Sequence, residues 1–172
     1  MTSLHDLVES RKSVRGYDQS RPVAPEILER VLNAGRLAPS AKNLQPWKFL
    51  VVSSPEMLAK VRPSYQRDWF AEAPHILIVT GDRTEAWVRP SDGWNSLETD
   101  LGIAMDHLIL AAHDEGLATC WISAFDPQML REALDLDPTE EVFAITPLGY
   151  ASADAQTRPK TRKTLDEVVR YL

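Results

Sequence analysis

Cysteine and glycine are both scarce in this chain, and each scarcity excludes a kind of site. Cys120 is the only cysteine among 172 residues, so neither an internal disulfide nor a cysteine metal cluster can form. The seven glycines include no Gly-x-Gly pair, so the Rossmann and P-loop fingerprints are absent. The four histidines also lack the spacing of metal ligands on a helix. We therefore expect no metal site, and Cys120, inside an apolar run, reads as a core residue.

Long apolar runs and net positive charge are lacking as well. No window approaches the ~20 apolar residues of a membrane span. The opening residues, MTSLHDLVESRK, lack the apolar core of a signal peptide. A net charge of −6 argues against broad binding to nucleic acid. Together with the lack of disulfides, these absences predict a cytoplasmic protein with neither membrane nor nucleic-acid partners.

The remaining sequence reads as one globular domain over residues 1–172. Its apolar fraction of 44% and charged fraction of 26% are typical of such domains, and it contains no repeat or linker. Helices and strands interleave without strict alternation, which predicts the α+β class with a mixed sheet. Helices are predicted at 3–10, 25–38, from 55 onward, 97–115 and 127–134, and strands at 47–52, 75–81, 118–123 and 141–150.

Two of these segments are unusual. The helix predicted at 97–115 is apolar nearly all round, which is typical of a helix buried on most sides. In so short a chain, that predicts packing against a second subunit. Residues 82–96, between this helix and the preceding strand, are polar but contain Trp87 and Trp94, which predicts a loop or a mobile flap.

Basic residues gather in two short stretches near opposite ends of the chain. Arg11, Ser13 and Arg15 alternate by two, so an extended backbone places them on one face, where guanidinium forks suit phosphate oxygens. The stretch RPKTRK at 158–163 places Lys160 and Arg162 on one face in the same way. The stretches hold three and four of the 19 basic residues, which favours a site for a small anion. Alternatively, they are a solvated helix end and a solvated tail.

Polar side chains also crowd a short bend between the second helix and the first strand. Ser40, Asn43 and Gln45 lie in APSAKNLQPW, where Asn and Gln amides can both donate and accept. Such groups suit the edge of a heterocycle. Proline, serine and asparagine are equally common in turns, so the bend alone leaves both interpretations open.

Taken in order, these segments resemble the nitroreductase family of FMN-dependent flavoproteins. The first motifs are the more specific ones, and the later ones carry weight by following in sequence. The motifs are Arg-x-Ser-x-Arg at 11–15, Ala-Pro-Ser-x-x-Asn-x-Gln-Pro-Trp at 38–47, an Ala-rich helix ending in Gly-Leu at 101–117, Thr-x-Trp-Ile at 119–122, Leu-Gly-Tyr at 148–150 and Lys-x-Arg at 160–162.

The resemblance implies a nitroreductase-like α+β fold, with a mixed, mostly antiparallel sheet flanked by helices, assembled as an intertwined homodimer with FMN at the interface. It implies that residues near both ends of the chain hold the FMN phosphate and ribityl chain: Arg11, Lys12, Ser13, Arg15, Lys160 and Arg162. The bend would reach the flavin from the partner subunit through Pro39, Ser40 and Asn43, with Gln45 nearby. The backbone at Ala118 and Thr119 would pass close to the isoalloxazine.

The activity implied is a ping-pong transfer of electrons from NAD(P)H through the flavin to a nitroaromatic, a quinone or a similar small acceptor. The flavin carries the chemistry, so no catalytic residue is expected. Reductive dehalogenation, substrate dehydrogenation and a non-catalytic flavin-storage module are the alternatives. The chain departs from the family pattern in two ways. Ala118 replaces the second glycine of Gly-Leu-Gly-Thr, and no helical insertion precedes the 97–115 helix.

Overall fold

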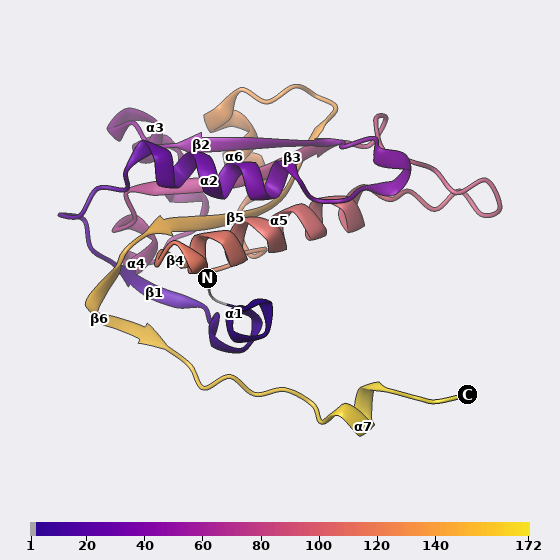
Figure 1. The fold of residues 1–172 in the computed structure, drawn as a ribbon. Coiled ribbons are helices and arrows are strands. Elements are labelled where there is room, and N and C mark those ends of the chain that lie inside the picture. Colours follow the sequence, from indigo (N-terminus) through magenta and orange to yellow (C-terminus); the bar gives the residue numbers. More distant parts are fainter. Residues whose placement is uncertain (1–2) are drawn as a thin grey trace.

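The computed structural model describes residues 3–172, and a four-stranded sheet forms its centre (Figure 1). All strand pairs of this sheet are antiparallel, and the spatial order is β2-β3-β5-β4. A separate two-stranded sheet pairs β1 with β6. The predicted α+β fold, a mostly antiparallel sheet flanked by helices, is confirmed. The strands are β1 (Val14–Tyr17), β2 (Trp47–Val52), β3 (His75–Asp82), β4 (Ala118–Thr119), β5 (Glu140–Gly149) and β6 (Ala151–Thr157).

The helices begin where the sequence supplies caps. Ser3 and Asp6 form a capping box at α1, and the side chains of Ser54 and Asp126 accept backbone N–H groups at the starts of α3 and α6. Pro25 occupies the first turn of α2, where its missing N–H costs nothing. The helices are α1 (Leu4–Ser10), α2 (Pro25–Arg36), α3 (Pro55–Val61), α4 (Asp68–Ala71), α5 (Leu97–Asp114), α6 (Pro127–Leu134) and α7 (Leu165–Val168), with 3₁₀ turns η1 (Ala41–Asn43) and η2 (Arg62–Ser64).

The central strand β3 is buried on both faces, which explains its continuous apolar sequence. Leu77 and Val79 point into a core shared with α2 and α5, while Ile76 and Ile78 point into one shared with α3 and α6. The helices thus form a layer on each side of the sheet (Figure 1). The sheet and α5 together provide the rigid frame on which the candidate site is built.

One predicted strand needs correction, and the strands β1 and β6 were not among the predicted ones. The strand expected at 118–123 is only Ala118–Thr119, followed by an isolated bridge between Ile122 and Ile145. It ends early because the Cys120 N–H donates to the Thr146 hydroxyl instead of continuing the backbone ladder. Strand β6 was not predicted, because its sequence ASADAQT lacks an apolar face, and only its pairing with β1 makes it extended.

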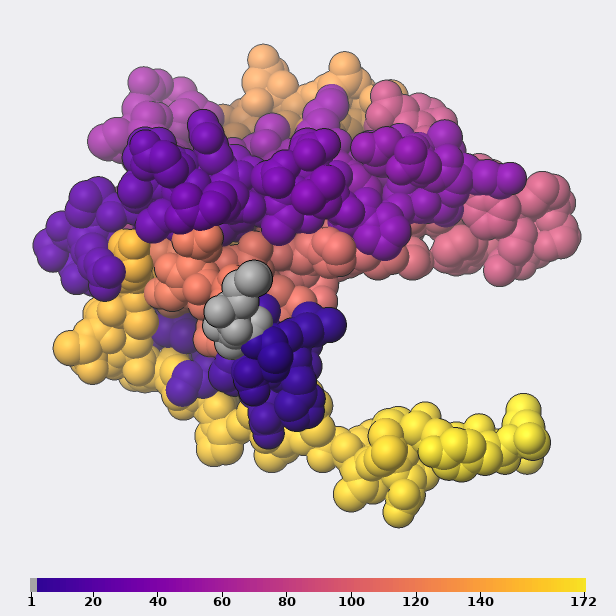
Figure 2. Space-filling view, viewed as in Figure 1, coloured from indigo at the N-terminus to yellow at the C-terminus, as the bar shows by residue number. Residues whose placement is uncertain are grey.

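The chain leaves the folded body after β6. Every residue from 157 to 172 is exposed, and in Figure 1 this segment carries α7 away from the other elements. The space-filling view shows the same tail standing clear of the body below α1 (Figure 2). Among residues 3–172, no helix has the length and apolar character needed to cross a membrane.

Candidate functional site

The two basic stretches meet at one cavity. Antiparallel pairing of β1 with β6 sets Val14 opposite Thr157 and Arg15 opposite Gln156, so the segments that flank these strands lie side by side. The cavity between them has a volume of 190 Å³, and no carboxylate lines it. Its lining is Ser13 and Pro159 together with six cationic residues, namely Arg11, Lys12, Arg15, Arg158, Lys160 and Arg162.

So many like charges around one small space repel one another unless an anion neutralises them. Reduced hydration and the neighbouring Arg11 and Arg162 lower the pKa of Lys160. This arrangement suits a ligand group that carries more than one negative charge, because each added oxygen can accept from a different cation. Arg158 was not among the residues predicted for this site, although it lies in the same basic stretch.

Lys160 has a second connection that sequence reasoning missed. Its ammonium group donates to the carbonyl oxygens of Val8, Glu9 (3.0 Å) and Arg11 (3.3 Å), the unpaired acceptors at the end of α1. Lys160 therefore ties the C-terminal stretch to the turn that presents Arg11. Arg15 makes a cation–π contact instead: its guanidinium carbon lies 5.8 Å from the centroid of the Trp69 ring.

The bend after α2 has a strained backbone. Lys42, Asn43 and Gln45 have φ angles of 56°, 58° and 53°, a region that residues with side chains seldom adopt. Internal bonds hold this shape, since the Gln45 N–H donates to the Ser40 hydroxyl (2.9 Å) and the Gln45 amide donates to the Asn43 carbonyl (3.1 Å). Strain that the surrounding structure enforces is typical of functional sites.

Glycine in β3 lets the bend close onto the sheet. A Cβ at Gly81 would lie 2.4 Å from the Pro46 carbonyl oxygen, so no larger residue fits there. The same carbonyl accepts from the Asp82 N–H (3.3 Å). Within this close-packed frame, Pro39, Asn43 and Gln45 remain exposed and Ser40 is half-buried.

The bend and the basic cavity do not meet within one chain. The bend is bonded to the start of α5, where Asp100 accepts the Ala41 N–H (2.9 Å). The α1 end of the cavity is bonded to the other end of α5, where the Ser10 hydroxyl lies 2.8 Å from His113 Nε2. A helix rises about 1.5 Å per residue, so these two anchors are roughly 20 Å apart. The structure therefore brings the predicted residues together as two separate groups.

Ala118 and Thr119 lie behind β1 and not in the cavity lining. Ala118 is 5% exposed and packs with Tyr17 and Ala73, so its methyl group fills core space. The replacement of glycine by alanine at this position is thus accommodated within the chain's own core. Cys120, which follows Thr119, is buried as predicted for a core residue, and burial raises the pKa of its thiol.

The two histidines of α5, His107 and His113, each contact a neighbouring segment. His107 Nδ1 lies 3.3 Å from the Ala34 carbonyl oxygen, and His113 pairs with Ser10 as described. Burial, with some help from the nearby Arg11, lowers the pKa of His113.

The polar segment at 82–96, predicted as a loop or a mobile flap, is a loop from residue 83 onward, and hydrogen bonds and ion pairs hold it as an arm. The Arg89 N–H donates to the Trp94 carbonyl (2.8 Å), and Arg89 makes a two-point ion pair with Asp92. At its base, Arg83 pairs with both Glu98 and Glu141. Yet Trp94 is 41% exposed near the tip. The arm leads into the start of α5, beside the bend, and projects from the body (Figure 1).

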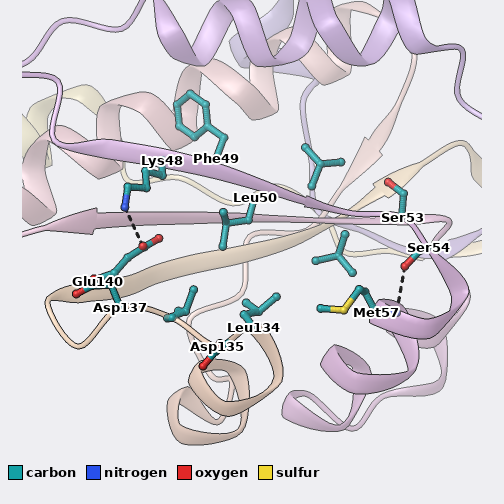
Figure 3. Close-up of a pocket in the computed structure, with 13 residues that line it drawn as sticks. Lys48, Phe49, Leu50, Ser53, Ser54, Met57, Leu134, Asp135, Asp137 and Glu140 are labelled. Atoms are coloured by element: carbon teal, nitrogen blue, oxygen red, sulfur yellow. Dashed lines mark hydrogen bonds and ion pairs between the residues drawn. The ribbon is translucent and has the colours of Figure 1, made fainter.

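A larger cavity, of 610 Å³, lies away from all the predicted site residues. It runs along the edge strand β2 between α3 and the segment after α6, with Lys48 and Glu140 paired at one end and Met57 at the other (Figure 3). A second hollow, of 510 Å³, adjoins the other face of the same strand at Trp47 and Phe49. Both hollows therefore lie beside the sheet edge at which β2 has no second strand partner among the described residues.

Asp100 is the clearest residue that sequence reasoning overlooked. It is 1% exposed, and the other buried residues of its helix are all apolar. Helical spacing offered a signal, because Asp100 precedes the apolar positions Ala104 and Leu108 by one and two steps of four. A carboxylate in line with a buried stripe predicts a buried hydrogen-bonding role.

Comparison with known proteins assigns the chain to a family. The model of the nitroreductase family matches residues 8–65 and 58–150. A relative from Archaeoglobus fulgidus, provisionally named an NADH dehydrogenase/NAD(P)H nitroreductase, is 31% identical over 84% of this chain and 83% of its own. A bacterial iodotyrosine deiodinase, from Haliscomenobacter hydrossis, is 25% identical over 92% of this chain and 84% of its own.

Solved structures support the same family assignment. A nitroreductase family protein from Clostridium difficile 630 is 32% identical, with a TM-score of 0.88 over 99% of this chain and 98% of that one. A structure from Exiguobacterium sibiricum, in complex with FMN, has the same fold, with a TM-score of 0.86 over 100% of this chain and 98% of that one at 22% identity. On the family match and these similarities, the chain belongs to the nitroreductase family.

Proposed function

We propose that this protein is an FMN-dependent oxidoreductase that passes electrons from NAD(P)H to a small acceptor such as a nitroaromatic or a quinone. The observation that carries the proposal is the cavity lined by six cationic residues and no carboxylate. The FMN phosphate is a dianion of the right kind for it. Support for the cofactor and the reductant comes from the FMN complex and the NAD(P)H nitroreductase name among the similar proteins.

The residues present fit FMN in their chemistry. Arg11, Arg15 and Arg162 supply forked donors for phosphate oxygens, and Ser13 adds a hydroxyl for the phosphate or the ribityl chain. Ser40, Asn43 and Gln45, held on the strained bend, supply the neutral polar groups that suit the edge of the flavin ring. When bound, FMN supplies the redox chemistry, and the chain supplies binding, orientation and electrostatics.

A complete site needs two copies of the chain. The cationic cavity and the bend are anchored roughly 20 Å apart along α5, so the bend that meets a given phosphate cavity belongs to the partner. Apolar side chains remain half-buried on α5, among them Ile103 and Leu110, and offer a surface for the partner helix. We therefore propose a homodimer with two flavin sites at its interface.

The visible spectrum of the purified protein tests this proposal. We expect a yellow protein whose flavin bands are bleached by NADH or NADPH under anaerobic conditions and restored by a nitroaromatic or a quinone. A colourless protein that cannot be reconstituted with FMN would overturn the cofactor assignment. Bound flavin that neither nicotinamide reduces would instead favour a flavin-storage module.

Reductive dehalogenation is the second candidate, because a similar protein is named an iodotyrosine deiodinase. Both reactions begin with the same reduced cofactor, so the acceptor distinguishes them. Reoxidation of the reduced protein by a halogenated phenol, with stoichiometric halide release and no response to nitroaromatics, would favour this candidate.

We also expect Trp94 on the arm to contact the acceptor, since the arm begins beside the bend and presents this ring to solvent. Replacing Trp94 with alanine should raise the KM for a planar aromatic acceptor about two- to tenfold, the usual range for one aromatic contact. The affinity for FMN should not change. Steady-state kinetics and flavin titration measure the two quantities. Trp94→Phe is the matched control: it keeps an aromatic ring, so its KM should stay close to that of the parent. Equal KM values in all three proteins would contradict the assignment.

A further inference from the structure

Asp100 is buried, yet it bonds to two segments that belong to different parts of the site. One carboxylate oxygen accepts the Ala41 N–H of the bend at 2.9 Å. The other accepts the Ser96 hydroxyl, at the base of the arm, at 2.7 Å. Among residues 3–172, no lysine, arginine or histidine forms an ion pair with Asp100, which is 1% exposed.

A buried carboxylate without a cation costs stability, and an apolar residue would pack there more cheaply. The two hydrogen bonds provide a reason for the acid. Ala41 lies directly before the three residues with positive φ, and Pro46, just beyond them, is held through its carbonyl by the Asp82 N–H. Asp100 therefore fixes one end of the strained bend, and β3 fixes the other.

The second bond extends this control to the arm. Ser96 joins the arm to α5, and its own N–H donates to the Trp87 carbonyl (2.9 Å) inside the arm. The Asp100 carboxylate thus bonds to both the bend and the base of the arm. Among the described residues, the bend has no other side-chain bond to the first turn of α5, whereas the arm is also held there by the Arg83–Glu98 ion pair and by the Asn95 oxygen, which accepts the Leu97 N–H (3.0 Å).

We propose that Asp100 is a positioning residue for the flavin ring, acting through the bend it holds. The inference rests on the proposed FMN function. It assigns Asp100 an effect on the ring and not on the phosphate, because the phosphate cavity is anchored at the opposite end of α5. This separation makes the effect distinguishable from that of the cationic residues.

Binding of FMN and of riboflavin, which lacks the phosphate, tests the inference. Asp100→Ala in the full-length protein should weaken both ligands by the same factor, about tenfold, as expected for loss of a buried charged acceptor. Asp100→Asn is the rescue variant. Its oxygen can still accept from Ala41 and its amide can donate to the Ser96 oxygen, so both affinities should stay within about threefold of the parent.

Leu130→Ala controls for general loss of stability, since Leu130 is fully buried in the core on the other face of the sheet. Thermal unfolding should show that this variant loses at least as much stability as Asp100→Ala while retaining flavin affinity. The inference is overturned if Asp100→Ala binds both ligands as tightly as the parent, if it loses FMN alone, or if Leu130→Ala weakens both ligands equally. A parent protein that binds no flavin would instead refute the proposed function.

Discussion

Replacing Arg11 with alanine is expected to raise the dissociation constant for FMN at least tenfold. Arg11 lines the cationic cavity, and the carbonyl bonds of Lys160 hold the turn that carries it. A hydrogen bond between charged groups contributes about 1.5–3 kcal/mol, which corresponds to about tenfold or more in affinity. Arg162→Ala should behave in the same way, because its side chain lines the same cavity from the other basic stretch.

Riboflavin provides the internal control for both variants. Because it lacks the phosphate, its affinity should change by no more than about twofold when either arginine is removed. Lys163→Ala is the matched protein control, since Lys163 is an exposed cation in the same stretch but does not line the cavity. Fluorescence titration of the apoprotein measures all the constants. Unchanged FMN affinity in both arginine variants would refute the phosphate role of the cavity.

The sequence predicted the elements whose ends carry their own chemical signals. Ser3, Ser54 and Asp126 begin helices because their side chains can accept backbone N–H groups, a local property that survives in any fold. Strand β6 carried no such signal. Its polar residues are extended only because β1 lies alongside, and that is a contact between segments more than 130 residues apart.

The candidate site likewise has features that the sequence predicted and features that it did not. The alternation of Arg11, Ser13 and Arg15 and the basic tail pointed to one anion site, and the structure places them around one cavity. The sequence spacing did not predict that the bend and the cavity lie at opposite ends of α5. Their positions depend on which end of the helix each segment is bonded to. The left-handed backbone of Lys42, Asn43 and Gln45 was not predicted either, since asparagine alone among these three side chains favours that region.

The same limit applies to the role of Lys160. Its position in a Lys-x-Arg motif predicted a contact with phosphate, whereas its bonds to the end of α1 arise from tertiary packing. Both roles place it at the cavity, where it lines the wall beside Arg11. Its replacement should therefore affect FMN binding through the position of Arg11 as well as through its own charge.

Removal of residues 164–172 is expected to convert the proposed homodimer to a monomer and to abolish FMN retention. The tail exposes a run of apolar side chains that its own chain leaves uncovered, including Val168 (62%), Tyr171 (88%) and Leu172 (fully exposed). Such a segment is unfavourable in water unless it docks. Because every residue from 157 onward is exposed, the body of the chain does not need the tail for its own core.

The edge of the central sheet offers the complementary surface. Strand β2 pairs with β3 on one side only, and hollows of 610 and 510 Å³ lie on its two faces. An extended peptide that adds to such an edge gains backbone hydrogen bonds and places alternate side chains into the two hollows. We expect the partner's tail to occupy this edge and so to hold the two chains of the proposed homodimer together.

Sedimentation velocity of the truncated chain tests the expectation, and circular dichroism reports whether the body stays folded. The expected result is a folded monomer that purifies without colour. Asp166→Ala in the full-length chain is the control, because it removes an exposed charge from the tail but none of its apolar side chains. A truncated protein that remains dimeric and yellow would show that the tail is not what joins the subunits. If the truncated chain forms a colourless dimer, the tail is needed for flavin binding and not for dimerisation.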